Sequence, residues 1–448
     1  MPFSCAECGY RTVKWYGRCP SCGAWDSISE VAGERAADAP DAPWIGEPVR
    51  SLDQIDVANV SRRPSGSREF DRVFGGGLIP GGVILFGGEP GVGKSTLLLQ
   101  VARALAERDG NVLYVSGEES ESQVKLRASR LGIDGARLFL LAEQSLPRIA
   151  AAVEEVDPCA LIVDSIQTIR AAAPDGAGGS VRQLRAACVE LIRLAKARRL
   201  VTFLVGHITK GGAFAGPKTI EHLVDVAVYM EGSGEDDVRI LRSVKNRFGP
   251  TNEAAVFRMT AEGLVEIDDP SSFFLETHRD ESRSGSIVVP ILEGSRSILI
   301  ELQALVSPTG GYGVPQRRCT GLDVNRILLL LAVIEKRLAV HVGGADVYLS
   351  VAGGLEVRER SADLGIVAAI VSSLRNRAIP VRTTVAGEVG LSGEVRAVRR
   401  VAERAAEAKK MGYQEILVPA SGTVPRGDGI DVVPVESIDE TIVHLGLG

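Results

Sequence analysis

The sequence contains a short motif whose residue types and spacing suit the binding of a nucleoside triphosphate. Residues 88–95, GEPGVGKS, fit the pattern G-x-x-x-x-G-K-[ST] and stand between an apolar strand candidate and a helical run. Glycine lets backbone N–H groups approach phosphate oxygens, and the N-terminus of the next helix adds a favourable dipole. We expect Lys94 to contact the β- and γ-phosphates and Ser95 to hold Mg²⁺. A glycine-rich turn that fits by chance is the alternative, and both flanking elements argue against it.

Two apolar strand candidates end near acidic residues that suit the same chemistry. Asp164 ends the run ALIVD, where a carboxylate can steady the hydration shell of Mg²⁺. Glu118 and Glu119 follow the run VLYVSG, and hydrolysis needs a group that orients and polarises the attacking water. In RecA-like ATPases the acid follows the strand after the P-loop helix, so we expect Glu118 to be catalytic, with Glu119 as its rival. An acidic helix start is compatible with that role. The residues expected to bind ATP and Mg²⁺ are Gly88, Glu89, Pro90, Gly91, Val92, Gly93, Lys94, Ser95, Thr96 and Asp164.

Four of the seven cysteines fall within the first 22 residues, as two C-x-x-C pairs. Cys5, Cys8, Cys19 and Cys22 supply four thiolates at a spacing that suits a closed, tetrahedral, structural Zn²⁺ site. A module this small has almost no apolar core, so metal binding would supply its folding energy. A redox C-x-x-C is the alternative, and two copies so close together favour zinc.

Further along the chain, a histidine, two glycine-rich segments and a basic run contain candidate residues for a nucleic-acid channel and for a subunit interface. His207 follows an apolar strand candidate, and on its own such a histidine is more often structural than functional. The glycine-rich segments Lys210–Pro217 and Pro174–Ser180 would face the central channel in a ring of RecA-like domains. Lys245 and Arg247 belong to the run KNRFG, which follows another strand candidate. This run is a basic strand end or, in the sharper interpretation, it completes the γ-phosphate site of a neighbouring subunit.

The elements that must position these residues alternate between strands and helices. With 448 residues the chain is too long for one core, and its pattern indicates four parts. After the cysteine module 1–30, residues 31–50 are rich in Ala, Pro and Asp and indicate a linker. Residues 51–270 alternate strands with helices, which implies an α/β fold with a mostly parallel sheet covered on both faces. Residues 271–448 form a second α/β block.

Composition and charge narrow the class of protein further. Hydrophobic residues make up 45% and charged residues 24% of the chain, an ordinary soluble balance. The net charge of −6 argues against a basic coat, although local patches decide nucleic-acid binding. The apolar run Ile327–Ile334 is far too short to cross a bilayer, and we recognise no secretory signal. We therefore expect a cytoplasmic protein without membrane contact, which the cysteine pattern also favours.

Taken together, these motifs resemble the bacterial RadA (Sms) family of recombination ATPases. The four-cysteine finger, GEPGVGKS, VSGEES, LIVDSIQT, GHITKGG and KNRFG occur in that order, so the resemblance covers nearly the whole chain. It implies a RecA-like P-loop ATPase core, an N-terminal zinc finger and a C-terminal Lon-protease-like domain. It also implies a homo-hexameric ring that binds single-stranded DNA in its channel and drives branch migration of recombination intermediates in homologous recombination and DNA repair. A recombinase is an implied further partner, and Lys245 and Arg247 would act across the subunit interface.

The Lon resemblance can be followed residue by residue. Ser361 stands where Lon-type proteases carry their nucleophilic serine, and the lysine position, counted on from Gly393, falls at Ala402. Lys409 and Lys410 lie about two helical turns further along. A serine without a nearby base is a weak nucleophile, so we expect no peptidase activity. An ATP-dependent protease and a P-loop switch or autokinase acting on proteins are the alternatives to a DNA motor. Salt-sensitive stimulation by single strands separates the motor from both, because phosphate contacts release counterions.

Overall fold

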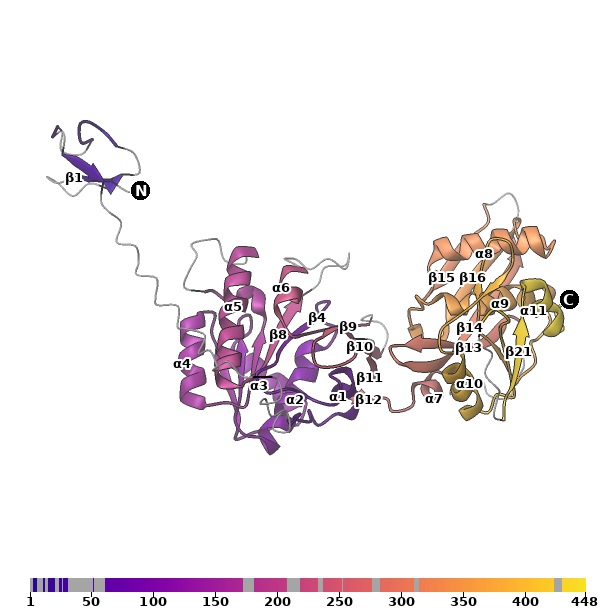
Figure 1. Cartoon of the computed structure of the whole chain (residues 1–448), viewed down its shortest axis with the longest axis horizontal. Coiled ribbons are helices and arrows are strands. Elements are labelled where there is room, and N and C mark those ends of the chain that lie inside the picture. The colour runs from indigo at the N-terminus through magenta and orange to yellow at the C-terminus, as the bar shows by residue number, and fades with distance from the viewer. Residues whose placement is uncertain are drawn as a thin grey trace. The chain divides into compact units, whose positions relative to one another are not determined.

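The computed structural model divides into two compact units, Met1–Asn59 and Val60–Gly448 (Figure 1). The described residues are 3–5, 11–12, 15–20, 24–25, 27–30, 51, 61–171, 181–207, 218–232, 237–251, 253–275, 283–309, 314–422 and 429–448. The linker predicted at 31–50 and the glycine-rich segments predicted at 174–180 and 210–217 lie outside them. Among the described helices, none combines the length and the apolar character that crossing a membrane requires.

The first unit carries a small antiparallel sheet in its cysteine-bearing segment. The strands are β1 (Phe3–Cys5), β2 (Arg11–Thr12) and β3 (Ile28–Glu30), in the order β2-β1-β3. A bridge between Arg18 and Trp25 and a 2.9 Å hydrogen bond from Cys19 N to Ala24 O close a further turn. Cys5 and Cys19 are buried and form a cluster of their own. Thiols therefore take the place of an aliphatic core in the described part of this module.

The second unit begins with a nine-stranded sheet in the order β12-β11-β10-β9-β4-β8-β7-β5-β6. Strands β9 to β6 of this order are all parallel, and β10, β11 and β12 extend the sheet as an antiparallel meander. The strands are β4 (Val83–Gly88), β5 (Val112–Ser116), β6 (Leu138–Ala142), β7 (Ala160–Asp164), β8 (Val201–His207), β9 (Val226–Glu231), β10 (Val238–Asn246), β11 (Ala254–Thr260) and β12 (Gly263–Glu266).

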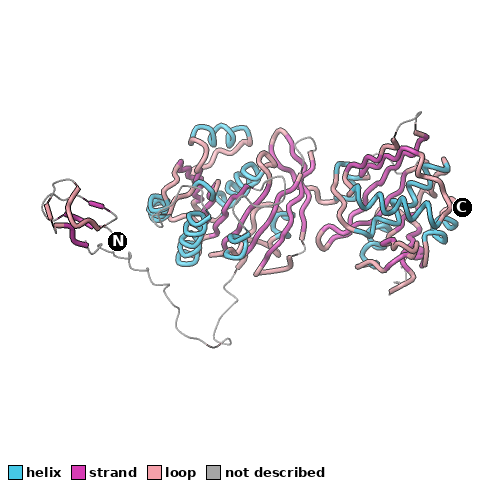
Figure 2. Tube along the Cα trace, turned by 90° about the horizontal axis from the view of Figure 1, so that it is seen from above, coloured by secondary structure: helices cyan, strands magenta, loops and turns pink. Residues whose placement is uncertain are grey.

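Helices cover both faces of this sheet, as Figure 2 shows for the cyan and magenta segments in the middle of the view. The helices are α1 (Arg68–Val73), α2 (Lys94–Arg108), α3 (Glu121–Arg130), α4 (Leu146–Val156), α5 (Val181–Arg198) and α6 (Lys218–Leu223), with a 3-10 turn η2 (Ile166–Thr168). One apolar cluster joins the sheet to α1, α2 and α3, and another joins it to α4 and α5. Every residue of β4 and β5 is buried, as expected for central parallel strands covered on both sides. The predicted α/β class with a parallel sheet is confirmed.

A seven-stranded mixed sheet in the order β15-β16-β14-β13-β17-β20-β21 organises the C-terminal part. Its strands are β13 (Ser286–Glu293), β14 (Arg296–Pro308), β15 (Arg317–Thr320), β16 (Ala345–Val351), β17 (Thr383–Val385), β20 (Glu415–Pro419) and β21 (Asp431–Val435), and β18 (Glu388–Val389) pairs with β19 (Val395–Arg396). Its helices are α7 (Pro270–Phe274), α8 (Val324–Arg337), α9 (Asp363–Arg375), α10 (Val401–Lys410) and α11 (Ile438–His444), with 3-10 turns η3 (Ala352–Gly354) and η4 (Arg360–Ala362). Helix α9 is buried along most of its length and packs on β13 and β14. The predicted boundary near residue 270 falls between the two sheets.

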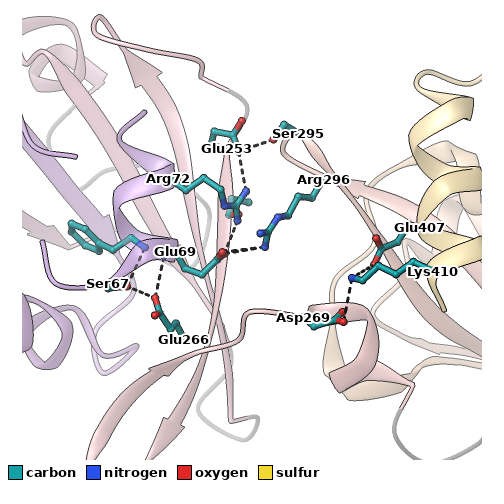
Figure 3. A network of polar contacts seen from close by, with 12 residues as sticks. Ser67, Glu69, Arg72, Glu253, Glu266, Asp269, Ser295, Arg296, Glu407 and Lys410 are labelled. Carbon is teal, nitrogen blue, oxygen red and sulfur yellow. Dashed lines mark hydrogen bonds and ion pairs between the residues drawn. The ribbon is translucent and has the colours of Figure 1, made fainter. Parts of the chain in front are cut away.

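Polar contacts connect the turn between β13 and β14 to α1 and to the start of β11 (Figure 3). Arg72 on α1 pairs with Glu253 at 2.9 Å and with Glu69 at 2.7 Å. The Ser295 hydroxyl donates to Glu253 at 2.7 Å, and Arg296 pairs with Glu69 at 3.1 Å. Both carboxylates are therefore shared between the two parts of this unit. Because Glu253 is largely buried, removal of Arg72 would leave its carboxylate with the Ser295 hydroxyl and without this arginine.

Helix α1 is fixed by an aromatic cluster rather than by its own length of six residues. The Phe70 ring is fully buried and lies 4.6 Å from the Phe74 ring centre and 6.3 Å from those of Phe86 and Phe203. The Ser67 hydroxyl caps the helix by accepting a hydrogen bond from Phe70 N. A helix this short is not stable alone, so its position depends on these rings.

We expect Phe70→Ala to destabilise this unit by about 3–5 kcal/mol, because it removes a fully buried ring and leaves a cavity. Differential scanning calorimetry of the whole chain would register the loss as a lower temperature of its first transition. Phe139→Ala is the matched control, since that ring is 39% exposed on the edge strand β6. An equal shift for both variants would contradict a special role of the aromatic cluster.

Candidate active site at the P-loop

The phosphate-binding motif lies between the central strand β4 and the N-terminus of α2. Gly91 and Gly93 have φ angles of 77° and 112°, in the left-handed region that favours glycine. A Cβ at Gly93 would come within 2.7 Å of the Met259 side chain, so the loop also lies close to the antiparallel meander. The Arg239 guanidinium of β10, itself buried, donates to Val92 O at 2.9 Å. The loop is thus held in shape from the strand side as well as by its own glycines.

Lys94 is buried, and its ammonium group turns back onto the loop. It donates to Gly88 O and Glu89 O, both at 2.8 Å, and lies 3.2 Å from His207 Nδ1. Burial lowers the Lys94 pKa to about 8, against the opposing influence of Asp164, Glu118 and Glu89. Burial therefore makes the Lys94 ammonium easier to deprotonate, and phosphate oxygens would stabilise its charged form.

Ser95 and Asp164 form a pair of oxygen ligands next to this lysine. The Ser95 hydroxyl donates to Asp164 Oδ2 at 2.6 Å, and the buried Tyr114 hydroxyl donates to the same oxygen at 2.6 Å. Hydroxyl and carboxylate oxygens are the donors that Mg²⁺ prefers, and Mg²⁺ is held in such sites by few protein ligands plus phosphates and water. The donor set therefore fits Mg²⁺. Burial raises the Tyr114 pKa well above its ordinary value, so its hydroxyl stays protonated.

The structure distinguishes the two acids that follow β5. Glu118 Oε1 accepts a hydrogen bond from the Ser165 hydroxyl at 2.5 Å and lies 3.5 Å from His207 Nε2. Glu119 instead pairs with Arg127 of α3, and its backbone N–H donates to the Ser116 hydroxyl at 3.0 Å. Glu118 therefore faces Lys94 through His207, whereas the Glu119 carboxylate is occupied by an arginine. This geometry favours Glu118 as the group that activates water.

His207 joins the site in a way that the sequence alone does not predict. Its two ring nitrogens lie next to Lys94 and Glu118, so the imidazole bridges the phosphate-binding lysine and the candidate base. The feature that places His207 in the site is the parallel pairing of β4 with β8, in which Gly88 stands opposite His207. Because parallel strands end at the same edge, a residue opposite Gly88 must lie beside the phosphate loop.

The KNRFG cations and the P-loop of their own chain lie at opposite ends of the parallel strands. Asn246 pairs with Val226 on β9, whereas Gly88 pairs with Met230, which is about 13 Å further along that strand. The Lys245 ammonium donates to the carbonyl oxygens of three residues at the end of α6: Glu221, His222 and Val224, at 2.8, 3.0 and 2.8 Å. It thereby satisfies helix-end carbonyls that have no partner within the helix.

Arg247 is held far more loosely than Lys245. Its guanidinium lies 3.8 Å from Asp225 and is 57% exposed. Asp225 is itself a buried hub that accepts from Val83 N at 3.0 Å and pairs with Lys196 at 2.6 Å. The fold does not bring either cation of the KNRFG run to the Lys94 site of the same chain.

Two of the four predicted metal ligands belong to the described residues. Cys5 and Cys19 are buried together, and Cys5 Sγ lies 3.3 Å from the Ser27 hydroxyl oxygen. Cys8 and Cys22 lie outside the described residues. Two buried thiols that pack on each other, from two C-x-x-C pairs, are a donor set that suits a soft metal ion such as Zn²⁺.

The structure shows which side chain stands beside Ser361. Ala402, at the position counted from Gly393 as that of the protease lysine, is exposed, and the residue that faces Ser361 is Arg404. Positions two residues apart on a helix point in nearly opposite directions, so these two residues lie on different faces of α10. Arg404 is fully buried, donates to the Ser361 hydroxyl oxygen at 3.0 Å and pairs with Glu359. A guanidinium stays protonated and cannot accept the serine proton, so this base position is filled by a group without base function.

Three family models match parts of this chain. Residues 52–213 match a family model described as an AAA domain, residues 3–30 a rubredoxin metal binding domain, and residues 347–422 subunit ChlI of Mg-chelatase. The DNA repair protein RadA of Bacillus subtilis is 44% identical, over 98% of this chain and 97% of its own length. The proteins of the same name from Streptococcus pyogenes serotype M1 and Listeria monocytogenes are 45% and 42% identical, with the same coverage.

A P-loop on a parallel sheet, together with the AAA match, defines the chain as a P-loop ATPase. Identities of 42–45% over nearly the whole length are more specific. The chain belongs to the RadA (Sms) family, as the resemblance of its motifs predicts.

We expect nucleotide binding to be accompanied by proton uptake at mildly alkaline pH. Burial lowers the Lys94 pKa to about 8, and bound phosphates would raise it. About half a proton per site should therefore be taken up at pH 8, and much less at pH 7, where the ammonium has already formed. Isothermal titration calorimetry with a non-hydrolysable ATP analogue and Mg²⁺, in buffers of different ionisation enthalpy, measures this uptake.

The sign follows from the lowered pKa, because the free protein loses the ammonium as pH rises through about 8 and its affinity for nucleotide falls. Lys94→Arg is the control, since a guanidinium does not titrate in this range and the uptake should vanish. Equal uptake at pH 7 and pH 8 would contradict the assignment to Lys94.

Proposed function

We propose that the chain is an ATP-driven DNA motor that binds single-stranded DNA and promotes branch migration of recombination intermediates in DNA repair. The observation that carries this proposal is that the residues proposed for ATP hydrolysis lie in two groups, at opposite ends of the parallel strands of one sheet. Lys94, Asp164 and Glu118 stand at one edge, and the KNRFG cations stand at the other. A motor built as a ring of identical subunits needs such a division, because each active site then reports on its neighbour. The names of the relatives support a role in DNA repair.

Hydrolysis at this site follows from the residues at the P-loop edge. Lys94 would exchange its bonds to Gly88 O and Glu89 O for the β- and γ-phosphates. Ser95 and Asp164 would hold Mg²⁺, which neutralises charge on the phosphates when bound. Glu118 would orient and polarise the attacking water, with His207 between it and the lysine. Each group lies at the end of a different parallel strand or at the start of α2.

Arg247 is the cation best placed to act on a neighbouring subunit. It is exposed, it is weakly held by Asp225, and it lies at the edge of the sheet that its own P-loop does not reach. Lys245 would have to leave three carbonyl oxygens to reach a phosphate, so we assign it first to anchoring α6 and second to the interface. Head-to-tail contacts of this kind repeat around a closed ring, which supports a homo-hexamer.

Contacts with DNA are proposed for the two glycine-rich segments, 174–180 and 210–217. Both follow strand ends at the P-loop edge, after Asp164 and His207 respectively. His207, three residues before the second segment, touches both Lys94 and Glu118, and this contact supports the proposal. A recombinase is a further proposed partner, and the cytoplasm is the proposed location.

The N-terminal module is proposed to bind Zn²⁺ through Cys5, Cys8, Cys19 and Cys22. The match of residues 3–30 to a rubredoxin metal binding domain and the burial of Cys5 with Cys19 support this. The C-terminal part is proposed to be a Lon-like domain without peptidase activity, because Arg404 occupies the position beside Ser361.

Single-stranded DNA should stimulate ATP hydrolysis severalfold at low salt, and raising the salt should weaken this stimulation, because phosphate contacts release counterions. Steady-state ATPase rates with and without an oligonucleotide test this. Lys94→Ala should abolish turnover in both conditions and serves as the baseline. Turnover that is indifferent to DNA at every salt concentration would favour a protein-directed switch instead.

Mixing two inactive variants should restore activity if the site is shared between subunits. Glu118→Gln removes the candidate base and should lower turnover at least 100-fold, whereas Arg247→Ala removes the cation that acts in trans. In a random one-to-one mixture about one quarter of the interfaces combine an intact Glu118 with an intact Arg247, so about a quarter of the normal rate should return. Glu119→Gln should retain most turnover by itself, because that carboxylate pairs with Arg127. No recovery on mixing would show that each chain completes its own site.

A further inference from the structure

Asp164 receives a hydrogen bond from a residue to which the P-loop motif assigns no function. The Tyr114 hydroxyl donates to Asp164 Oδ2 at 2.6 Å, the same distance as the bond from Ser95. Two donors from different elements, α2 and β5, therefore converge on one carboxylate oxygen. Within the described part of the chain, no donor reaches the other oxygen, Oδ1, so that oxygen is the one left for water around a metal ion.

Whether the Tyr114 hydroxyl can reach Asp164 depends on the register between β5 and β7. In the parallel pairing of β5 with β7, Asp164 stands opposite Ser116, and Tyr114 precedes Ser116 by two residues. That offset is about 7 Å along the strand, so the donor must sit at the end of a long side chain lying along the sheet. A serine or threonine at position 114 would be too short, and a phenylalanine would fill the same space without a donor.

Because the Tyr114 hydroxyl is buried, it needs a hydrogen-bond partner within the protein. Tyr114 is 1% exposed and belongs to the apolar cluster between the sheet and α2. A buried hydroxyl that finds no partner is costly, and water does not reach this one. It donates to Asp164, so the side chain and the carboxylate are fixed relative to each other by the fold itself.

The serine on its own cannot give the carboxylate a fixed orientation. When Ser95 holds Mg²⁺ it directs a lone pair at the metal, and its proton can rotate about the Cβ–Oγ bond. Tyr114 does not also have to bind the metal ion, because its ring is enclosed in the core. Its bond keeps Asp164 Oδ2 in place whichever way the serine proton points.

We infer that Tyr114 is a positioning residue for Asp164, and that the affinity of the nucleotide-bound site for Mg²⁺ depends on its hydroxyl. The inference rests on the ATPase part of the proposed function and is independent of DNA. Partners that orient the ligands of a metal ion from behind are worth about 10- to 100-fold in metal affinity. Because the Asp164 carboxylate is also held by Ser95, the effect should lie at the lower end of that range.

The test uses the whole chain with Tyr114→Phe and a fluorescent, slowly hydrolysed ATP analogue. The Mg²⁺ concentration that gives half-maximal binding of the analogue should rise about tenfold. Binding of the analogue in EDTA should not change, and excess Mg²⁺ should restore the rate of ATP hydrolysis. These three readouts together separate positioning of the metal ligand from general damage to the fold.

Two controls make the result decisive. Tyr229→Phe removes a partly buried tyrosine hydroxyl that also donates to a carboxylate, Glu221 at 3.0 Å, and should leave the Mg²⁺ midpoint within about twofold of the unmodified protein. In an Asp164→Ala background, which leaves the Tyr114 hydroxyl no acceptor at position 164, the addition of Tyr114→Phe should shift the midpoint less than twofold, because the two residues act through one bond. A lower melting temperature with an unchanged midpoint, or a tenfold shift that persists without Asp164, overturns the inference. Absence of DNA stimulation would count against the motor and leave this result standing.

Discussion

The parallel register of β4, β8, β7 and β5 is the constraint on which the site depends. It sets Gly88 opposite His207 and Asp164 opposite Ser116, so that four strand ends meet at one edge of the sheet. Short hydrogen bonds then join neighbours that are far apart in the sequence, such as Ser95 with Asp164 and Ser165 with Glu118. A one-residue slip in any pairing would turn these side chains to the other face of the sheet.

Much of the site could be predicted from the sequence, because a phosphate loop is a local motif. The glycines and Lys94 act within eight consecutive residues, so their pattern survives without knowledge of the fold. Asp164 and Glu118 could be predicted because each ends an apolar strand, and strand ends are where parallel sheets place functional groups. The α/β class followed from the same alternation. The sequence favours Glu118 over Glu119 only by analogy with RecA-like ATPases, and the structure adds that the Glu119 carboxylate pairs with Arg127 of α3.

Residues whose roles come from pairing between distant strands could not be predicted. His207 is placed by its register with Gly88, and Tyr114 by an offset of two residues from Ser116. The contact of Arg404 with Ser361 could not be predicted either, because the sequence does not tell which face of α10 meets the serine. The same limit applies to the contacts between Arg296 and Glu69, which join residues 227 positions apart.

The unequal anchoring of Lys245 and Arg247 sets how fast each cation can be exchanged. Lys245 makes three short bonds to helix-end carbonyls, and all three must break before its ammonium moves. Arg247 has one loose, solvent-screened contact with Asp225, and Asp225 keeps Lys196 when the guanidinium departs. The Arg247 guanidinium can therefore leave Asp225 by rotation of its own side chain, whereas movement of the Lys245 ammonium must break its contacts with the end of α6. The KNRFG run thus contains one weakly held cation, Arg247, and one firmly anchored cation, Lys245.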